Sequence, residues 1–160
     1  ERHYIWGNRY LMCVATTDTA ARVEQSPKKI TLHVQPGTTQ EKREELYEDG
    51  MRLKLKSAIS PLIAKWQPIL GVNVKGFFVQ RMKTKWGSCS PTRGTIRLNT
   101  ELAKKPRQCL EYIVVHEMLH LLEPTHNERF RKLLDRFMPR WKERIKTLNS
   151  LPVRHEEWGY

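Results

Sequence analysis

The chain has 160 residues, of which 39% are hydrophobic and 29% are charged, enough apolar side chains for one packed domain over residues 1–160. This composition excludes a disordered or low-complexity protein, and no apolar run is long enough to span a membrane. The formal net charge of +12 favours contact with polyanions such as nucleic acid, although the basic residues are dispersed. Three widely spaced cysteines do not suggest a disulfide framework and favour a reducing, cytoplasmic setting.

Short strands are predicted for residues 1–37 and a long helix for residues 38–68. Lys29–Val34 alternates apolar and polar residues, as a half-buried strand does. Thr38 is followed three residues later by Glu41, which predicts a capped helix start, and Pro68 is expected to end the helix.

Further strands and a Trp-Gly-Ser loop are predicted for residues 72–99. Apolar runs at 72–74 and 77–79 indicate one strand region. Thr95–Leu98 is expected to form a sheet edge beside a cleft, where an extended peptide could add as another strand.

Helices are predicted for residues 106–149. The stretch from Leu110 to Leu122 is apolar around most of its circumference, so a buried helix is expected, with Pro124 stopping it. Thr125 with Glu128 predicts the capped start of the next helix.

A candidate metal site lies on the buried helix. His116 and His120 are four residues apart, so both imidazoles face one side of the helix and can reach one ion. Glu117 lies about 100° around the helix, beside such an ion, where it can take a proton from water. The third ligand is either Glu123 or His126. The turn at Pro124 favours His126, because it moves Glu123 off the helical face and can return His126 toward the metal.

The His-Glu-x-x-His pattern also occurs by chance among hydrogen-bonded side chains. Against this, a His, Glu and His cluster inside so apolar a helix would be costly without a partner. The remaining histidines show no ligand spacing and are interpreted as structural or exposed: His3, His33 and His155.

Several residues near the motif are further candidates for the site. Lys83 and Lys85 could hold phosphates, and Trp86 could either stack on a substrate or pack in the core. Cys89 is either a small buried residue, the favoured reading, or a fourth ligand or reactive thiol. Tyr112 lies one turn before His116, where it either stabilises an oxyanion or packs behind the ligands.

Several stretches together resemble the YgjP-like family of predicted metal-dependent hydrolases, which is related to SprT-like and WLM-type zinc metallopeptidases. They are Met82–Ser90, Ile96–Asn99, Tyr112–Leu121, His126 and Phe130. The resemblance is strong from about Val74 to Trp141 and looser before it, where the family often has more strand-forming sequence ahead of this chain's first residue.

The resemblance implies an α+β, minimal zincin-like fold in which a small, mostly antiparallel sheet packs on the motif helix, with further helices. It implies zinc on His116, His120 and His126, Glu117 as general base, and the Trp-Gly-Ser loop close by. Family members are described as metallopeptidase-like and also as nucleotide (UTP) pyrophosphatases.

Three functions therefore compete: a zinc metallopeptidase, a nucleotide pyrophosphatase, and a non-enzymatic zinc-stabilised module that binds nucleic acid. The absence of a Gly-rich phosphate-binding loop counts against the second, and the absence of a nucleic-acid motif counts against the third. The expected substrate is a peptide or a nucleotide. Zinc is the expected metal, although nickel, cobalt and copper bind the same donors. The sequence does not determine the oligomeric state.

Overall fold

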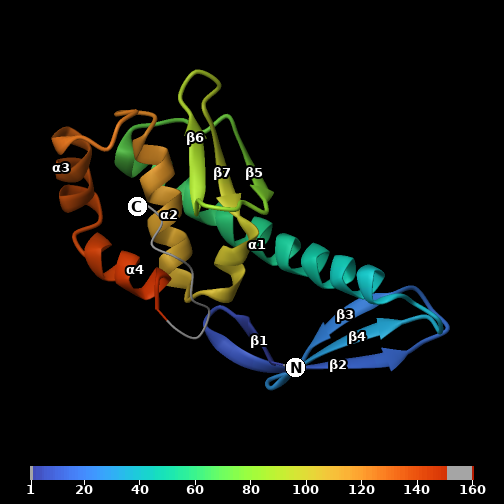
Figure 1. Cartoon of the computed structure of the whole chain (residues 1–160). Coiled ribbons are helices and arrows are strands. Elements are labelled where there is room, and N and C mark those ends of the chain that lie inside the picture. Colours follow the sequence, from blue (N-terminus) through green and yellow to red (C-terminus); the bar gives the residue numbers. More distant parts are fainter. Residues whose placement is uncertain (1, 151–159) are drawn as a thin grey trace.

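The computed structural model describes residues 2–150 and 160. Its first sheet lies at one end of the molecule (Figure 1). Its strands are β1 (Arg2–Ile5), β2 (Asn8–Thr16), β3 (Arg22–Gln25) and β4 (Lys29–Val34), in the order β1-β2-β4-β3. β2 and β4 pair in parallel, whereas β1–β2 and β3–β4 pair antiparallel. Alternate residues of β4 are buried, so the half-buried strand predicted there is confirmed.

Helix α1 (Gln40–Leu70) joins this sheet to the rest of the molecule (Figure 1). Its N-cap lies one residue later than predicted, because the side chain of Thr39 rather than Thr38 accepts a hydrogen bond from the Lys42 amide at 3.3 Å. It also ends later than predicted, since Pro68 lies inside the last turn and Gly71, with φ 70°, forms the left-handed cap. At 1.5 Å per residue the helix is about 46 Å long.

Burial is uneven along α1. No residue from Gln40 to Gly50 is buried, and the buried stripe starts only at Met51. It then recurs every three or four residues through Leu55, Ile59, Ile63, Trp66 and Leu70. The later turns therefore belong to the main core, whereas the first turns cover only part of the first sheet.

The second sheet contains β5 (Gly76–Gln80), β6 (Gly87–Ser90) and β7 (Thr95–Asn99), in the order β5-β7-β6. The strand predicted at 72–74 does not form, and β5 starts at Gly76. The prediction that Thr95–Leu98 is a sheet edge is wrong, because β7 pairs with β5 on one side and β6 on the other. β6 is an edge strand instead.

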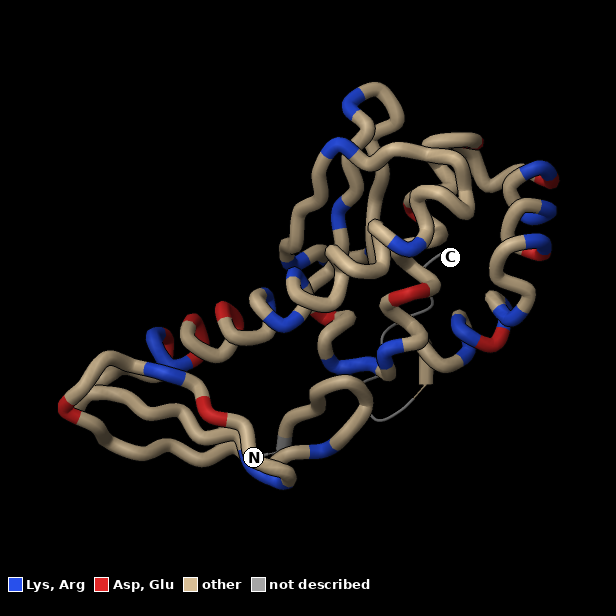
Figure 2. The backbone as a smooth tube through the Cα atoms, turned by 180° about the vertical axis from the view of Figure 1, so that it is seen from behind, with Lys and Arg blue, Asp and Glu red and all other residues tan. Residues whose placement is uncertain are grey.

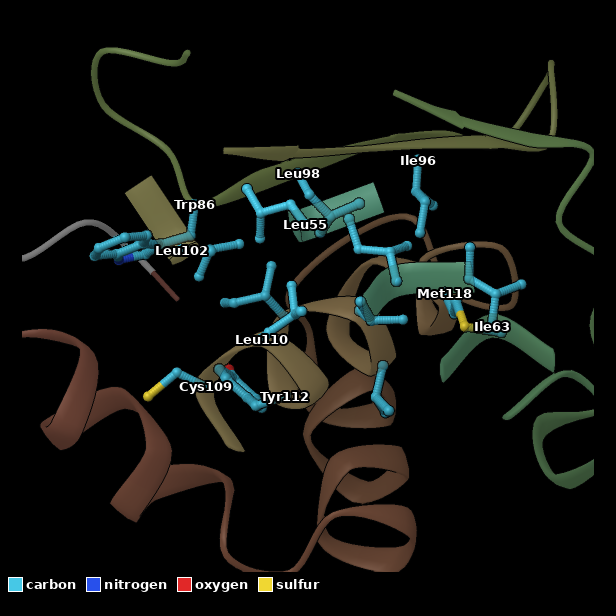
Figure 3. Packing of buried hydrophobic residues seen from close by; sticks show 14 of the residues in the cluster. Leu55, Ile63, Trp86, Ile96, Leu98, Leu102, Cys109, Leu110, Tyr112 and Met118 are labelled. Carbon is cyan, nitrogen blue, oxygen red and sulfur yellow. The ribbon is translucent and has the colours of Figure 1, made fainter. Parts of the chain in front are cut away.

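The second half of the chain is helical, with η1 (Thr100–Lys104), α2 (Arg107–Leu119), α3 (Glu128–Phe137) and α4 (Trp141–Leu148). Helix α2 lies against β6, β7 and α1 and is almost entirely buried. Figure 3 shows how side chains of β7, α1 and α2 meet in this core, among them Leu98, Leu55 and Leu110. The predicted α+β class is confirmed, with two small mixed sheets instead of one.

None of the helices in the described part of the chain is both long and apolar enough to cross a membrane.

Candidate metal centre

The end of α2 positions the first two histidines. His116 is 1% exposed in the last turn and His120 is the C-cap, 8% exposed. The helix stops at Leu119, earlier than the predicted Leu122. Tight turns follow, in which the Leu122 and Glu123 amides donate to the Leu119 carbonyl at 2.9 and 3.0 Å. These turns send the chain back across the end of α2.

The third histidine precedes α3. The side chain of Asn127 caps this helix by accepting a hydrogen bond from the Phe130 amide at 3.0 Å, so the cap predicted at Thr125 is wrong. Thr125 instead donates its amide to the Glu123 carboxylate at 3.3 Å. His126 therefore lies on the loop just before the cap, with its ring toward α2.

The Nε2 atoms of all three histidines converge. His126 Nε2 lies 3.0 Å from His116 Nε2 and 2.9 Å from His120 Nε2. Three nitrogens bound tetrahedrally to one ion at about 2.0–2.1 Å would be roughly 3.3 Å apart, so the observed cluster is close to a metal-binding arrangement. Among the described residues these three form the one group of His, Cys, Asp or Glu ligand atoms close enough to hold a metal.

The partners of the other ring nitrogens support a metal at this point. His120 Nδ1 lies 3.0 Å from the Glu123 carbonyl, which can only accept, so Nδ1 carries the hydrogen and Nε2 presents a lone pair. Burial lowers the pKa of His116 well below its ordinary value and also lowers that of His126, which keeps these rings neutral. Neutral imidazole nitrogens facing one another this closely fit a shared cation, which they would coordinate through their lone pairs.

The carboxylate of Glu123, the alternative third ligand, lies outside this cluster. It is 3.6 Å from the Arg129 guanidinium, and only its backbone carbonyl reaches a metal-site histidine.

Glu117 lies beside the cluster and is 2% exposed. Burial raises the pKa of its carboxyl to about 8, although a hydrogen bond from Tyr160 and the charge of Lys85 act in the opposite direction. Its Oε2 atom has no hydrogen-bond partner in the described part of the chain. Such a carboxyl can hold or release a proton near neutral pH.

A cavity of about 380 Å³ opens onto these residues. We call it the metal pocket. One wall is formed by Glu117, His120 and His126, and the other by β6 and the loop before it. The full lining is Thr84, Lys85, Gly87, Ser88, Cys89, Pro91, Glu117, His120, Pro124, His126 and Tyr160.

The Trp-Gly-Ser loop brings β6 against Glu117. A Cβ atom at Gly87 would lie 3.0 Å from Glu117 Oε2 and 2.8 Å from the Arg97 carbonyl oxygen, so only glycine fits without a shift. Trp86 is 1% exposed and packs in the core, so its reading as a substrate-stacking residue is wrong.

Other residues singled out in the sequence divide between the pocket and its surroundings. Lys85 lines the pocket, whereas Lys83 does not. Tyr112 is fully buried, and its hydroxyl lies 3.0 Å from His116 Nδ1, so it packs behind the ligand rather than facing a substrate. Cys89 lines the pocket but is not in the histidine cluster. Burial raises its thiol pKa to about 12, which disfavours a reactive thiolate.

Tyr160 was not expected in the site. The sequence predicts a peripheral tail after Pro152, and residues 151–159, including His155 and Trp158, lie outside the described residues. The Tyr160 hydroxyl, however, lies 2.8 Å from the Gly87 amide nitrogen and contacts the Gly87 carbonyl and the Glu117 carboxyl. Its ring centroid is 4.7 Å from that of His116. Neither motif nor spacing in the sequence indicates this contact.

Comparison with known proteins identifies a family. Residues 1–151 match the model of the YgjP-like metallopeptidase domain. No relative was found among the curated proteins.

One solved structure is similar in fold, and a second was matched with a lower score. The crystal structure of the metallopeptidase zymogen of Pyrococcus abyssi abylysin is 24% identical with a TM-score of 0.52, over 57% of this chain and 91% of that one. The crystal structure of the metallopeptidase zymogen of Methanocaldococcus jannaschii jannalysin is 24% identical with a TM-score of 0.47, over 54% and 83% of the two chains.

Proposed function

The chain belongs to the YgjP-like metallopeptidase family, and we propose that it is a zinc-dependent peptidase using His116, His120 and His126 as ligands and Glu117 as general base. The observation that carries the proposal is the convergence of three imidazole nitrogens beside a buried carboxyl at an open cavity. Imidazole nitrogen is a preferred zinc donor, and three protein ligands leave one position for water. The three cysteines are free, which supports the further proposal of a reducing, cytoplasmic location.

The chemistry divides between the metal and the chain. When bound, zinc supplies a Lewis acid that activates water and polarises the scissile carbonyl. Glu117 takes the water's proton on its carboxylate and gives it to the leaving amine. Burial raises the pKa of this carboxyl to about 8 in the metal-free chain, and a cation bound beside it would favour the ionised form that accepts the water's proton. The Tyr112 hydroxyl and the Glu123 carbonyl hold His116 and His120 in position.

The edge strand β6 is the proposed place for an extended peptide. It pairs with β7 on one side only, and its residues Gly87 to Cys89 line the pocket beside Glu117. A peptide adding to this edge would bring its backbone carbonyls toward the histidines. The Gly87 amide, which now contacts the Tyr160 hydroxyl, is one donor available to such a strand.

The nucleotide pyrophosphatase is a second candidate, favoured by the position of Lys85 on the pocket wall. It is the weaker one, since Lys83, the other proposed phosphate ligand, does not line that cavity. The third candidate, a zinc-stabilised nucleic-acid-binding module, predicts no turnover and an affinity that falls steeply with salt.

The experiment follows two products from the zinc-loaded protein, namely new amino termini from an unfolded protein substrate and pyrophosphate from UTP. The proposal predicts peptide cleavage that Glu117→Gln lowers at least about a thousandfold while zinc content is unchanged. Lys85→Gln should leave cleavage within a fewfold of wild type. Pyrophosphate release lost on Lys85→Gln would favour the second candidate, and no product in either assay would favour the third.

A further inference from the structure

Helix α1 covers only half of the first sheet. It lies against β3 and β4 (Figure 1). Side chains of the neighbouring strand β2 remain partly exposed. Met12 and Val14 of β2 pair in register with Ile30 and Leu32 of β4, so they point to the same face of the sheet. Val14 is nevertheless 53% exposed, whereas Leu32 is buried. The apolar face of the sheet therefore continues past the helix.

A cavity of about 710 Å³ occupies this space. Met12, Val14 and Leu32 form its apolar floor, and the first turns of α1 form its wall. The first turns of α1 have no buried residues, so no side chain of the main core extends into this cavity.

The wall is acidic. Glu41, Glu44, Glu45 and Glu48 recur at helical spacing and all line the cavity. Figure 2 shows the red bands along the first turns of α1. The excess is local, because the whole chain has 29 basic and 17 acidic residues.

Two arginines line the same cavity and offset part of this charge, so the four glutamates leave an excess of two negative charges. The Arg43 guanidinium donates to the Thr38 carbonyl at 2.9 Å, and Arg81 lies 3.9 Å from Glu48. Tyr47, on the same wall, has a buried hydroxyl without a hydrogen-bond partner in the described part of the chain. We call this cavity, with its four glutamates and the floor of Met12, Val14 and Leu32, the acidic groove.

We propose that the acidic groove docks a peptide segment in which apolar side chains alternate with lysine or arginine. The apolar side chains would cover the open face of β2, and the cations would lie along the glutamates of α1. An acidic wall within a strongly basic protein selects for cations locally, where the overall charge would repel them.

A short segment of the protein links the acidic groove to the metal pocket, because Arg81 lines the groove and Lys85 lines the pocket. Four residues span at most about 14 Å. A single extended peptide bound to the protein could therefore contact both sites. Use of the groove to hold a peptidase substrate rests on the proposed function, whereas the docking itself does not.

The test measures binding of short fluorescent peptides to the full chain carrying Glu117→Gln, which prevents cleavage from complicating the result. One probe alternates leucine with lysine and the other alternates leucine with glutamate. The proposal predicts that the leucine–lysine peptide binds more tightly, although the protein's net charge of +12 alone would favour the other.

Two charge-matched variants locate the binding. Glu41→Gln/Glu44→Gln/Glu45→Gln removes three charges from the groove and should weaken binding roughly tenfold, because three exposed ion pairs with the probe are lost. A control variant removes the same number of charges elsewhere and should bind like the parent: Asp18→Asn/Asp49→Asn/Glu128→Gln. Circular dichroism checks that both variants fold.

A floor variant, Val14→Ser, tests the apolar contribution and should also weaken binding. Equal binding of both probes, or equal loss in the groove and control variants, would overturn the proposal. Analytical ultracentrifugation tests a different occupant. If the wild-type protein is a dimer and the groove variant is a monomer, a second copy of the chain occupies the groove, and the proposal is overturned.

Discussion

The metal pocket and the acidic groove are both concave, but they hold their ionisable groups in opposite ways. In the metal pocket, burial raises the pKa of Glu117 and lowers that of His116, so the site obtains its chemistry from desolvation. In the groove, Glu41, Glu44 and Glu45 are exposed to solvent beside an apolar floor. Substitutions in the pocket should therefore change protonation and metal binding, whereas removing a charge from the groove should change only the attraction between charged partners.

The largest expected effect tests whether the pocket depends on its third imidazole. His126→Ala should weaken zinc binding more than about a hundredfold, beyond the cost of losing a residue that only orients a ligand. Glu123→Ala should keep most of the affinity, because it retains the backbone carbonyl that orients His120. Competition with a chromophoric chelator measures both. Full zinc occupancy in His126→Ala would remove that histidine from the site.

The second prediction concerns the residue behind His116. Tyr112→Phe removes the hydroxyl 3.0 Å from His116 Nδ1 and should lower zinc affinity about tenfold, with little change in fold. The same chelator competition measures it. An unchanged affinity would mean that Tyr112 only fills space.

A third prediction compares buried and exposed carboxyls in the metal-free protein. The folded-state pKa of Glu117 is raised from 4.5 to about 8, so its carboxyl stays protonated while the unfolded chain ionises. Its contribution to stability is therefore present below pH 4.5 and is lost as the pH rises toward 8. Glu117→Gln should thus raise the free energy of unfolding by several kcal/mol at pH 8, at about 1.4 kcal/mol for each unit of raised pKa, with the gain vanishing near pH 4.5.

The matched variant for this comparison is Glu44→Gln in the groove. Because Glu44 is exposed, the change in unfolding free energy should stay within about 0.5 kcal/mol at every pH. Urea denaturation at several pH values measures both variants, and a pH-independent effect of Glu117→Gln would contradict the desolvation argument.

The smallest expected effect concerns Tyr160. Tyr160→Phe removes the hydroxyl that contacts Gly87 and Glu117, and it should raise kcat/KM for peptide cleavage about fivefold, the equivalent of one hydrogen bond. The reason is that substrate would no longer compete for the Gly87 amide. A lower kcat with unchanged KM would instead assign Tyr160 a part in the reaction.

Local patterns predicted which histidines come together better than they predicted the boundaries of the elements. The spacing of His116 and His120 places two imidazoles on one helical face, and the break at Pro124 favours His126 over Glu123; the structure brings His126 into the same cluster. Caps were each misplaced, by one residue at Thr39 and by two at Asn127, because neighbouring Thr and Asn side chains compete for the same role. Pro68 was wrongly read as a helix end, since Gly71 supplies the left-handed cap.

Helical periodicity and apolar content are local properties, so the sequence alone predicts a buried helix that presents two histidines and a carboxyl. Only the tertiary structure decided that β6 rather than β7 is the edge, that Trp86 is core, and that Tyr160 reaches Glu117. It also decided that α1 is offset over the first sheet and leaves the acidic groove open. The physical reason is that these features depend on which distant segments pack together, and no spacing along the chain encodes that directly.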